Sequence, residues 1–173
     1  MISKYLYAWL LVYALVAFGC SKSSNEIAAI RQYPIRDLQG IITQTGIEFD
    51  PQASSDGNGS LHITTTDSVT VRLFETGDID VEDARLVYRA KLKTRDLTGK
   101  AYLEMWCHFQ GQVEFFSRGL HNPLSGTNDW SSAETFFMLQ KGENPDNVRL
   151  NLVISGAGEA WIDDIMLEKA PLK

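Results

Sequence analysis

The chain has 173 residues, a formal net charge of −6 and a hydrophobic content of 44%, with four Trp, six Tyr and eight Phe. A modestly acidic chain without a cluster of Lys and Arg is poorly suited to nucleic acid, because such binding depends on neutralising phosphates. The same balance disfavours electrostatic binding to anionic lipid.

The N-terminus has the pattern of a secretory signal. Lys4 is followed by an uncharged apolar run from Tyr5 to Phe18, and a small residue, Gly19, closes it. This run of 14 residues is shorter than the ~20 that a membrane-spanning helix needs, so we expect a cleaved signal over residues 1–19. Cleavage removes Lys4, which takes the charge from −6 to −7 and leaves 154 residues, enough for one domain.

The end of this signal, Ala17-Phe18-Gly19-Cys20, resembles the lipobox of bacterial lipoproteins, although Ala17 stands where Leu is usual. The resemblance implies cleavage after Gly19 and acylation of Cys20, and acyl chains anchor a protein firmly in a membrane. Ser21 rather than Asp follows the cysteine, which implies the outer membrane. The alternative is an ordinary signal peptide with a chance cysteine.

We expect residues 20–39 to hold the lipidated cysteine, a polar tether and a lead-in. Residues 26–38 could begin as a helical turn, but Pro34 interrupts it, so we assign them only to the lead-in. Residues 40–173 read instead as short alternating strands between turn residues, which is typical of an all-β sandwich. The turn residues gather at 54–59 and in an expected loop at 119–128. The expected strands, about eight, are 60–66, 68–74, 85–94, 99–109, 113–118, 132–139, 148–155 and 159–168.

Three stretches carry a more specific pattern: DGNGSL at 56–61, GTNDW at 126–130 and GAGEAWIDDI at 156–165. Together they resemble the galactose-binding-like jelly rolls of carbohydrate-binding modules, over roughly residues 45–168. The resemblance implies a jelly-roll β-sandwich of antiparallel strands and marks fold better than function. In the expected last strand, residues 159–168, we expect Trp161 to fill the core and Asp163 and Asp164 to alternate faces.

The same resemblance implies a structural calcium ion, held by an Asp of the last strand and by residues near the start of the domain. Asp164, Glu48 and Asp50 are the candidates, since calcium takes six to eight oxygen ligands. The alternative is that these acids are solvated or cap a strand end. No other cofactor is implied.

The candidate ligand site is one face of residues 102–109. Leu103, Met105, Cys107 and Phe109 form an apolar face, with Cys107 expected to be an inert buried thiol. The opposite face combines aromatic rings with hydrogen-bonding groups, as sugar recognition requires, and Arg118 on the next strand could add a forked donor. Its members are Tyr102, Glu104, Trp106 and His108. The alternative is that Trp106 and Tyr102 pack under loops as a second small core.

Catalysis has little support in the sequence. Glu104 and His108 share a face but lie about 13 Å apart along an extended strand, too far for a shared proton. We therefore expect a membrane-anchored, non-catalytic cell-envelope lipoprotein that binds carbohydrate. The alternative is a structural lipoprotein that docks onto an envelope assembly through an exposed apolar patch around Phe115 and Phe116.

Overall fold

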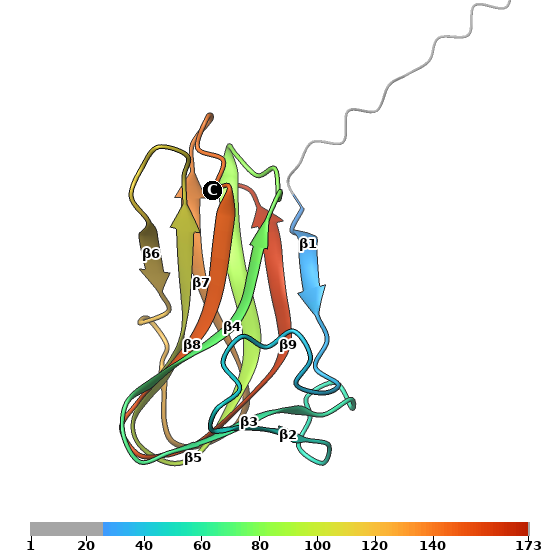
Figure 1. Cartoon of the computed structure of the whole chain (residues 1–173), viewed down its shortest axis with the longest axis vertical. Coiled ribbons are helices and arrows are strands. Elements are labelled where there is room, and N and C mark those ends of the chain that lie inside the picture. Colours follow the sequence, from blue (N-terminus) through green and yellow to red (C-terminus); the bar gives the residue numbers. More distant parts are fainter. Residues whose placement is uncertain (1–25, 173) are drawn as a thin grey trace, which may run out of the picture.

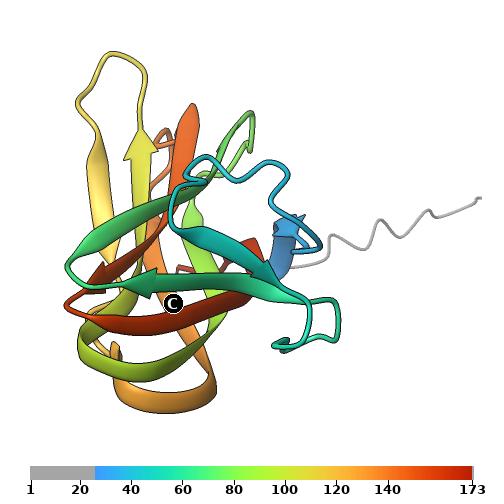
Figure 2. The same cartoon turned by 60° about the horizontal axis from the view of Figure 1, so that its bottom comes forward.

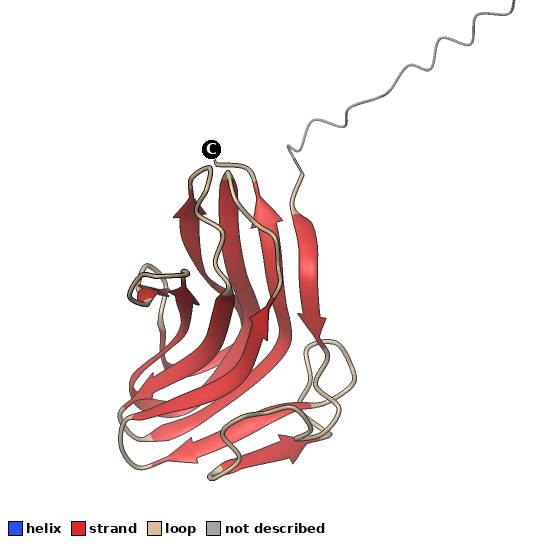
Figure 3. Cartoon of the chain, turned by 45° about the horizontal axis from the view of Figure 1, so that its top comes forward, coloured by secondary structure: helices blue, strands red, loops and turns tan. Residues whose placement is uncertain are grey.

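The computed structural model describes residues 26–172, and this part of the chain consists of strands and loops without a helix (Figure 3). No segment of it is therefore a helix that could span a bilayer. The strands are β1 (Ala28–Tyr33), β2 (Ile47–Asp50), β3 (Ser60–Thr65), β4 (Val69–Gly77), β5 (Ala84–His108), β6 (Phe115–Arg118), β7 (Leu124–Leu139), β8 (Asn147–Ser155) and β9 (Gly158–Ala170).

The nine strands form one antiparallel sheet that curls into two layers, which confirms the predicted β-sandwich. β5 connects the layers, because it bends at the bottom of the molecule (Figure 1). Its first half pairs with β7 and β9, whereas its second half pairs with β6 and β8. β2 and β3 cross beneath the sandwich and extend the sheet from the start of β9 (Figure 2).

The core lies between the layers and follows the predicted alternation. In β5, Leu86, Tyr88 and Leu92 point inward and are completely buried, while Arg89 and Lys91 remain partly exposed on the other side. A period of two is what a strand with one buried face requires. The predicted apolar face of the second half is also confirmed: its residues from Leu103 to Cys107 are buried, and Phe109 packs against the core.

Residues 95–98, expected to separate two strands, lie inside β5. The strand bends here, and two features accompany the bend: the pairing of β5 with β7 is irregular in register, and Asp96 has a φ of +51°. Gly99 lets the backbones of β5 and β8 approach closely at this bend, because a Cβ on residue 99 would lie 1.8 Å from the carbonyl oxygen of Ser155. Leu97, in the same stretch, is buried.

The N-terminal segment differs from the expectation: residues 28–33, assigned to a lead-in before the sandwich, form strand β1. β1 pairs with β9 from Ala28 opposite Lys169 to Tyr33 opposite Ile165, and so satisfies backbone groups that β9 would otherwise leave unpaired. The Tyr33 ring also stacks on Phe74, with 4.3 Å between ring centroids. The segment expected to be a lead-in therefore contributes a strand to the sheet.

The predicted loop at 119–128 is also shorter than expected. β7 begins at Leu124, because residues 124–128 continue its pairing along the bend of β5, with Gly126 opposite Leu97 and Leu124 opposite Ala101. The loop between β6 and β7 is thus residues 119–123.

Candidate functional site

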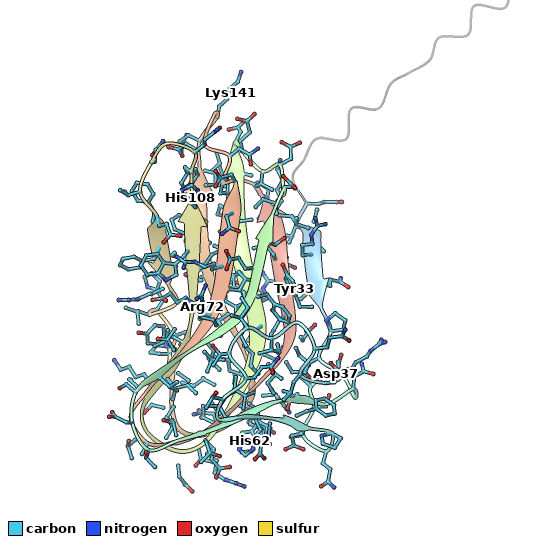
Figure 4. All side chains as sticks on the ribbon, in the orientation of Figure 1. Tyr33, Asp37, His62, Arg72, His108 and Lys141 are labelled. Atoms are coloured by element: carbon cyan, nitrogen blue, oxygen red, sulfur yellow. The ribbon has the colours of Figure 1, made fainter. Side chains whose placement is uncertain are left out.

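The outward face of the layer formed by β4, β8, β5 and β6 carries the predicted polar and aromatic set. Antiparallel pairing places side chains of opposed residues on the same face. Glu104 of β5 lies between Asn151 of β8 and Arg118 of β6. In the next row, Trp106 lies between Arg149 of β8 and Phe116 of β6. Figure 4 looks onto this face and labels Arg72 of β4 near its middle.

The centre of the face is a carboxylate that accepts three side-chain hydrogen bonds. Glu104 Oε1 accepts from Trp106 Nε1 at 2.7 Å and from Asn151 Nδ2 at 3.1 Å, while Oε2 accepts from Arg118 Nε at 2.6 Å. Although it lies on the outward side of the sheet, Glu104 is only 4% exposed. We call Glu104, Trp106, Arg118 and Asn151 the Glu104 cluster.

Burial alone would raise the pKa of Glu104, but the hydrogen bonds from Trp106, Arg118 and Asn151 and the charge of Arg118 outweigh it. The net effect lowers the pKa of Glu104 below its ordinary value. The carboxylate is therefore a fixed anion at neutral pH, which orients the indole and the guanidinium rather than exchanging protons.

One polar atom of this cluster has no hydrogen-bond partner among the described residues. Asn151 is 5% exposed, and its Oδ1 is a buried acceptor beside Glu104 and Arg72. Leaving a buried acceptor unpaired costs free energy, so such groups in native proteins usually meet water or a ligand.

Aromatic and cationic groups line one side of the cluster. The rings of Trp106 and Phe116 are tilted, with centroids 5.0 Å apart, and the Arg149 guanidinium lies 5.5 Å from the Trp106 ring centroid. Arg118 lies 4.5 Å over the Phe116 ring, whose residue is 50% exposed. Arg149 is held in turn by Glu114, with Nη2 to Oε2 at 2.5 Å.

The other two predicted ligand residues share the face but not the hydrogen bonds. Tyr102 lies opposite Val153, two residues from Glu104 along β5, and is partly exposed. His108 lies at the upper end of the face, where its Nδ1 is 2.5 Å from Asp146 Oδ1 (Figure 4). The structure thus brings together three of the five predicted residues, with Tyr102 beside them and His108 at the rim.

Asn151 and Arg149 were not selected from the sequence, and Phe116 was selected only for an apolar docking patch, not for this site. The available signal was the alternation of residues 148–155, in which Arg149 and Asn151 interrupt an apolar run at alternate positions. Their position beside β5 depends on long-range strand pairing, which that alternation does not specify.

The candidate calcium residues are dispersed. Glu48 is exposed on β2, and Asp50 already accepts hydrogen bonds from the backbone of Gln52 and Ala53 and from Trp161 Nε1. Asp164 lies in an irregular part of β9 with φ at +50°. Over residues 26–172, no group of three or more acids, histidines or cysteines is arranged to hold a metal ion. A calcium site at these residues stays a prediction that their placement does not support.

Trp161 is buried, as expected, but on the outward side of β9 rather than in the cluster between the layers. Its neighbours in β9, Ala160 and Ile162, point into the core, so Trp161 points outward. There it stacks on His62, with ring centroids 4.4 Å apart, beneath the Arg95 guanidinium. Asp163, by contrast, is completely buried and accepts hydrogen bonds from Ser54 and Ser55.

The comparisons with known proteins give a likeness of structure alone. No family model and no curated protein matches the sequence. The CBM22-1 xylan-binding domain of Paenibacillus barcinonensis Xyn10C superposes with a TM-score of 0.57 and 9% identity, over 84% of this chain and 94% of that chain. A family 16 carbohydrate-binding module gives a TM-score of 0.51 and 13% identity, over 70% and 84%.

The domain has a carbohydrate-binding-module fold. A third solved structure agrees: the CBM22-1 and GH10 modules of Clostridium thermocellum endo-1,4-beta-D-xylanase 10B, complexed with xylohexaose. It matches with a TM-score of 0.58 and 8% identity, over 82% of this chain and 28% of that chain. At such identities the likeness establishes the jelly-roll fold and leaves the ligand to be argued from the residues themselves.

Proposed function

We propose that this domain is a non-catalytic carbohydrate binder and that the Glu104 cluster with Tyr102 forms its site. The observation that carries the proposal is the buried Glu104 carboxylate, which holds the Trp106 indole and the Arg118 guanidinium in place on the outward face. A site whose side chains are already fixed loses less entropy when a ligand binds. Asn151 Oδ1 is itself shielded from solvent, so a sugar would contact the exposed part of the cluster, where Arg118 offers further N–H donors and Phe116 offers apolar surface.

The first ligand class to test is neutral β-linked polysaccharide of the xylan type. Two structural neighbours are described as a xylan-binding domain and as CBM22-1 and GH10 modules complexed with xylohexaose, and each contains a domain of this fold. The charged groups of the face agree with a neutral ligand, because Arg118 is paired with Glu104 and Arg149 with Glu114.

The absence of catalysis is part of the proposal. A general acid near neutral pH needs a raised pKa, whereas the pKa of Glu104 is lowered by its three hydrogen-bond donors. His108, the imidazole of the predicted face, is paired with Asp146 at the rim.

The test is isothermal titration of the purified full chain with xylo- and cello-oligosaccharides, alongside Trp106→Ala and the control Lys141→Ala. Lys141 lies at the tip of an upper loop, away from the face (Figure 4). We expect binding that Trp106→Ala abolishes and Lys141→Ala preserves. If the Trp106→Ala protein bound with the same affinity as wild type, the site would not lie on this face. If wild type bound no saccharide, the proposed function would be overturned.

We further propose that the domain is lipid-anchored in the outer membrane through Cys20, which lies outside the described residues. Support comes from the sequence of residues 1–20 and from the short stretch that separates Cys20 from the start of β1 at Ala28. Fractionation of cells that express wild type and Cys20→Ala tests this. A wild-type protein that is not in the membrane fraction would contradict it.

A second candidate function is docking onto a protein of the envelope. Large apolar side chains exposed on β6, β7 and their flanking loops favour it, since an exposed apolar patch commonly marks an interaction surface. They are Val113, Phe115, Phe116, Leu120, Phe136 and Met138. This function predicts a stoichiometric partner that is lost in Phe115→Asp, together with no response to saccharides.

A further inference from the structure

A hollow of about 400 Å³ lies beside the Glu104 cluster, at the side of the sandwich where β6 faces β7. Its volume is in the range of ligand pockets. Residues from β6, from the 119–123 loop and from β7 line it, among them Arg118, His121, Asn122, Ser132, Glu134 and Phe136. Arg118 belongs to both places, since it donates to Glu104 and also lines the hollow.

The base of the hollow is held by two direct contacts between its walls. Ser117 Oγ and Thr135 Oγ1 are 2.7 Å apart and hydrogen-bonded, which ties β6 to β7. Gly119 approaches the carbonyl oxygen of Glu134 so closely that a Cβ would lie 2.5 Å from it, and its own N–H donates to the Leu103 carbonyl at 2.9 Å. The hollow is therefore formed by packed strands.

Its lining suits an uncharged, hydroxyl-rich ligand. Glu134 is oriented by Arg89, at 3.3 Å from Nη2 and 3.4 Å from Nε, and Ser132 Oγ accepts from Lys91 at 2.9 Å. His121 and Asn122 are exposed and offer both donors and acceptors. Phe136 is 37% exposed and supplies an apolar surface, the second element that sugar recognition needs.

We propose that this hollow is a second subsite for the same saccharide chain. The inference rests on the proposed function and extends it: sugar units bound at the Glu104 cluster continue across β6 and past Arg118, and further units enter the hollow. Within residues 26–172, β6 is the edge strand next to β5 on the side of the hollow, and neighbouring strands are ~4.8 Å apart. The domain then recognises a chain of several units rather than a single terminal sugar.

The experiment titrates the full chain, purified in detergent, with xylo- and cello-oligosaccharides of two to six units. The double variant His121→Ala/Asn122→Ala removes two exposed side chains of the hollow that make no side-chain hydrogen bond within residues 26–172, so it should leave folding intact. Lys141→Ala is the matched surface control, and Trp106→Ala reports on the Glu104 cluster.

In wild type we expect affinity to rise with chain length. The double variant should lose about tenfold in affinity for the longest saccharides, the scale of one or two hydrogen bonds, and nothing for the disaccharides. Trp106→Ala should weaken all lengths. Affinity independent of length, or a double variant equal to wild type for six units, overturns the second subsite and leaves the proposed function standing. Failure of every saccharide to bind wild type overturns both.

Discussion

Glu104 is a charged side chain that the fold keeps out of solvent on the outward side of a sheet. Its burial is tolerated because three donors satisfy it, and the same donors are thereby fixed in orientation. A buried carboxylate of this kind couples stability to the geometry of the proposed site, since its removal frees both Trp106 and Arg118.

We expect Glu104→Gln to lower the free energy of unfolding at pH 7 by about 1.5–3 kcal/mol, the range for hydrogen bonds to charged groups. Urea unfolding followed by tryptophan fluorescence measures this. Glu114→Gln is the matched control, because it breaks an ion pair with Arg149 on the same face at a more exposed position. Equal losses in the two variants would contradict a special contribution from the buried carboxylate.

The same residue predicts a dependence on pH. A carboxyl whose pKa is lower in the folded state stabilises the protein above its unfolded value and loses that contribution as pH falls toward the folded value. For Glu104 this window begins near its ordinary value of 4.5 and extends below it. Between pH 7 and 3, wild type should therefore lose more stability than Glu104→Gln in urea titrations, and parallel curves would contradict the lowered pKa.

Among the elements, β5 decides the architecture, because one strand of 25 residues takes part in both layers. Its two halves and their buried faces could be predicted from alternation alone, as could the polar face from Tyr102 to His108. Its continuity could not, because residues 95–98 resemble a turn and are held in the strand by contacts with β7 and β9. Asn151 was missed for the same reason: strand neighbours distant in sequence are not specified by local pattern.

The bend of β5 gives a prediction at this scale. Gly99→Ala places a Cβ against the carbonyl oxygen of Ser155 and should destabilise the protein by about 1–3 kcal/mol, the usual cost of overpacking, or by more. Gly142→Ala serves as the comparison. Gly142 has φ at +87° but open space around it, so only backbone strain of about 1 kcal/mol is expected. Thermal melts in which Gly142→Ala is the less stable variant would contradict this reading of the bend.

For the whole molecule, the alternating pattern of short strands and turn residues was enough to predict a β-sandwich. It was not enough to predict where the domain begins. β1 is a short, mostly exposed strand whose pattern carries little signal, yet Ile30 packs against the core and Ile35, just beyond it, is 2% exposed.

A chain that begins at residue 40 should therefore be markedly less stable than one that begins at residue 26, because it lacks β1, Tyr33 and Ile35. Differential scanning calorimetry of the two chains checks this. Equal melting temperatures would show that β1 adds nothing to the domain.

The antiparallel pairing of β1 with β9 also has a mechanical consequence. β1 enters at the top of the sandwich and runs down beside β9, so a pull on the N-terminus acts along the strand axis (Figure 1). Hydrogen bonds of an antiparallel pair lie across that axis and are loaded together in shear rather than opened one by one. In the proposed arrangement, with a polymer bound on the sheet face and a lipid anchor at the N-terminus, tension would load the pairing of β1 with β9 in the direction in which it resists separation most strongly.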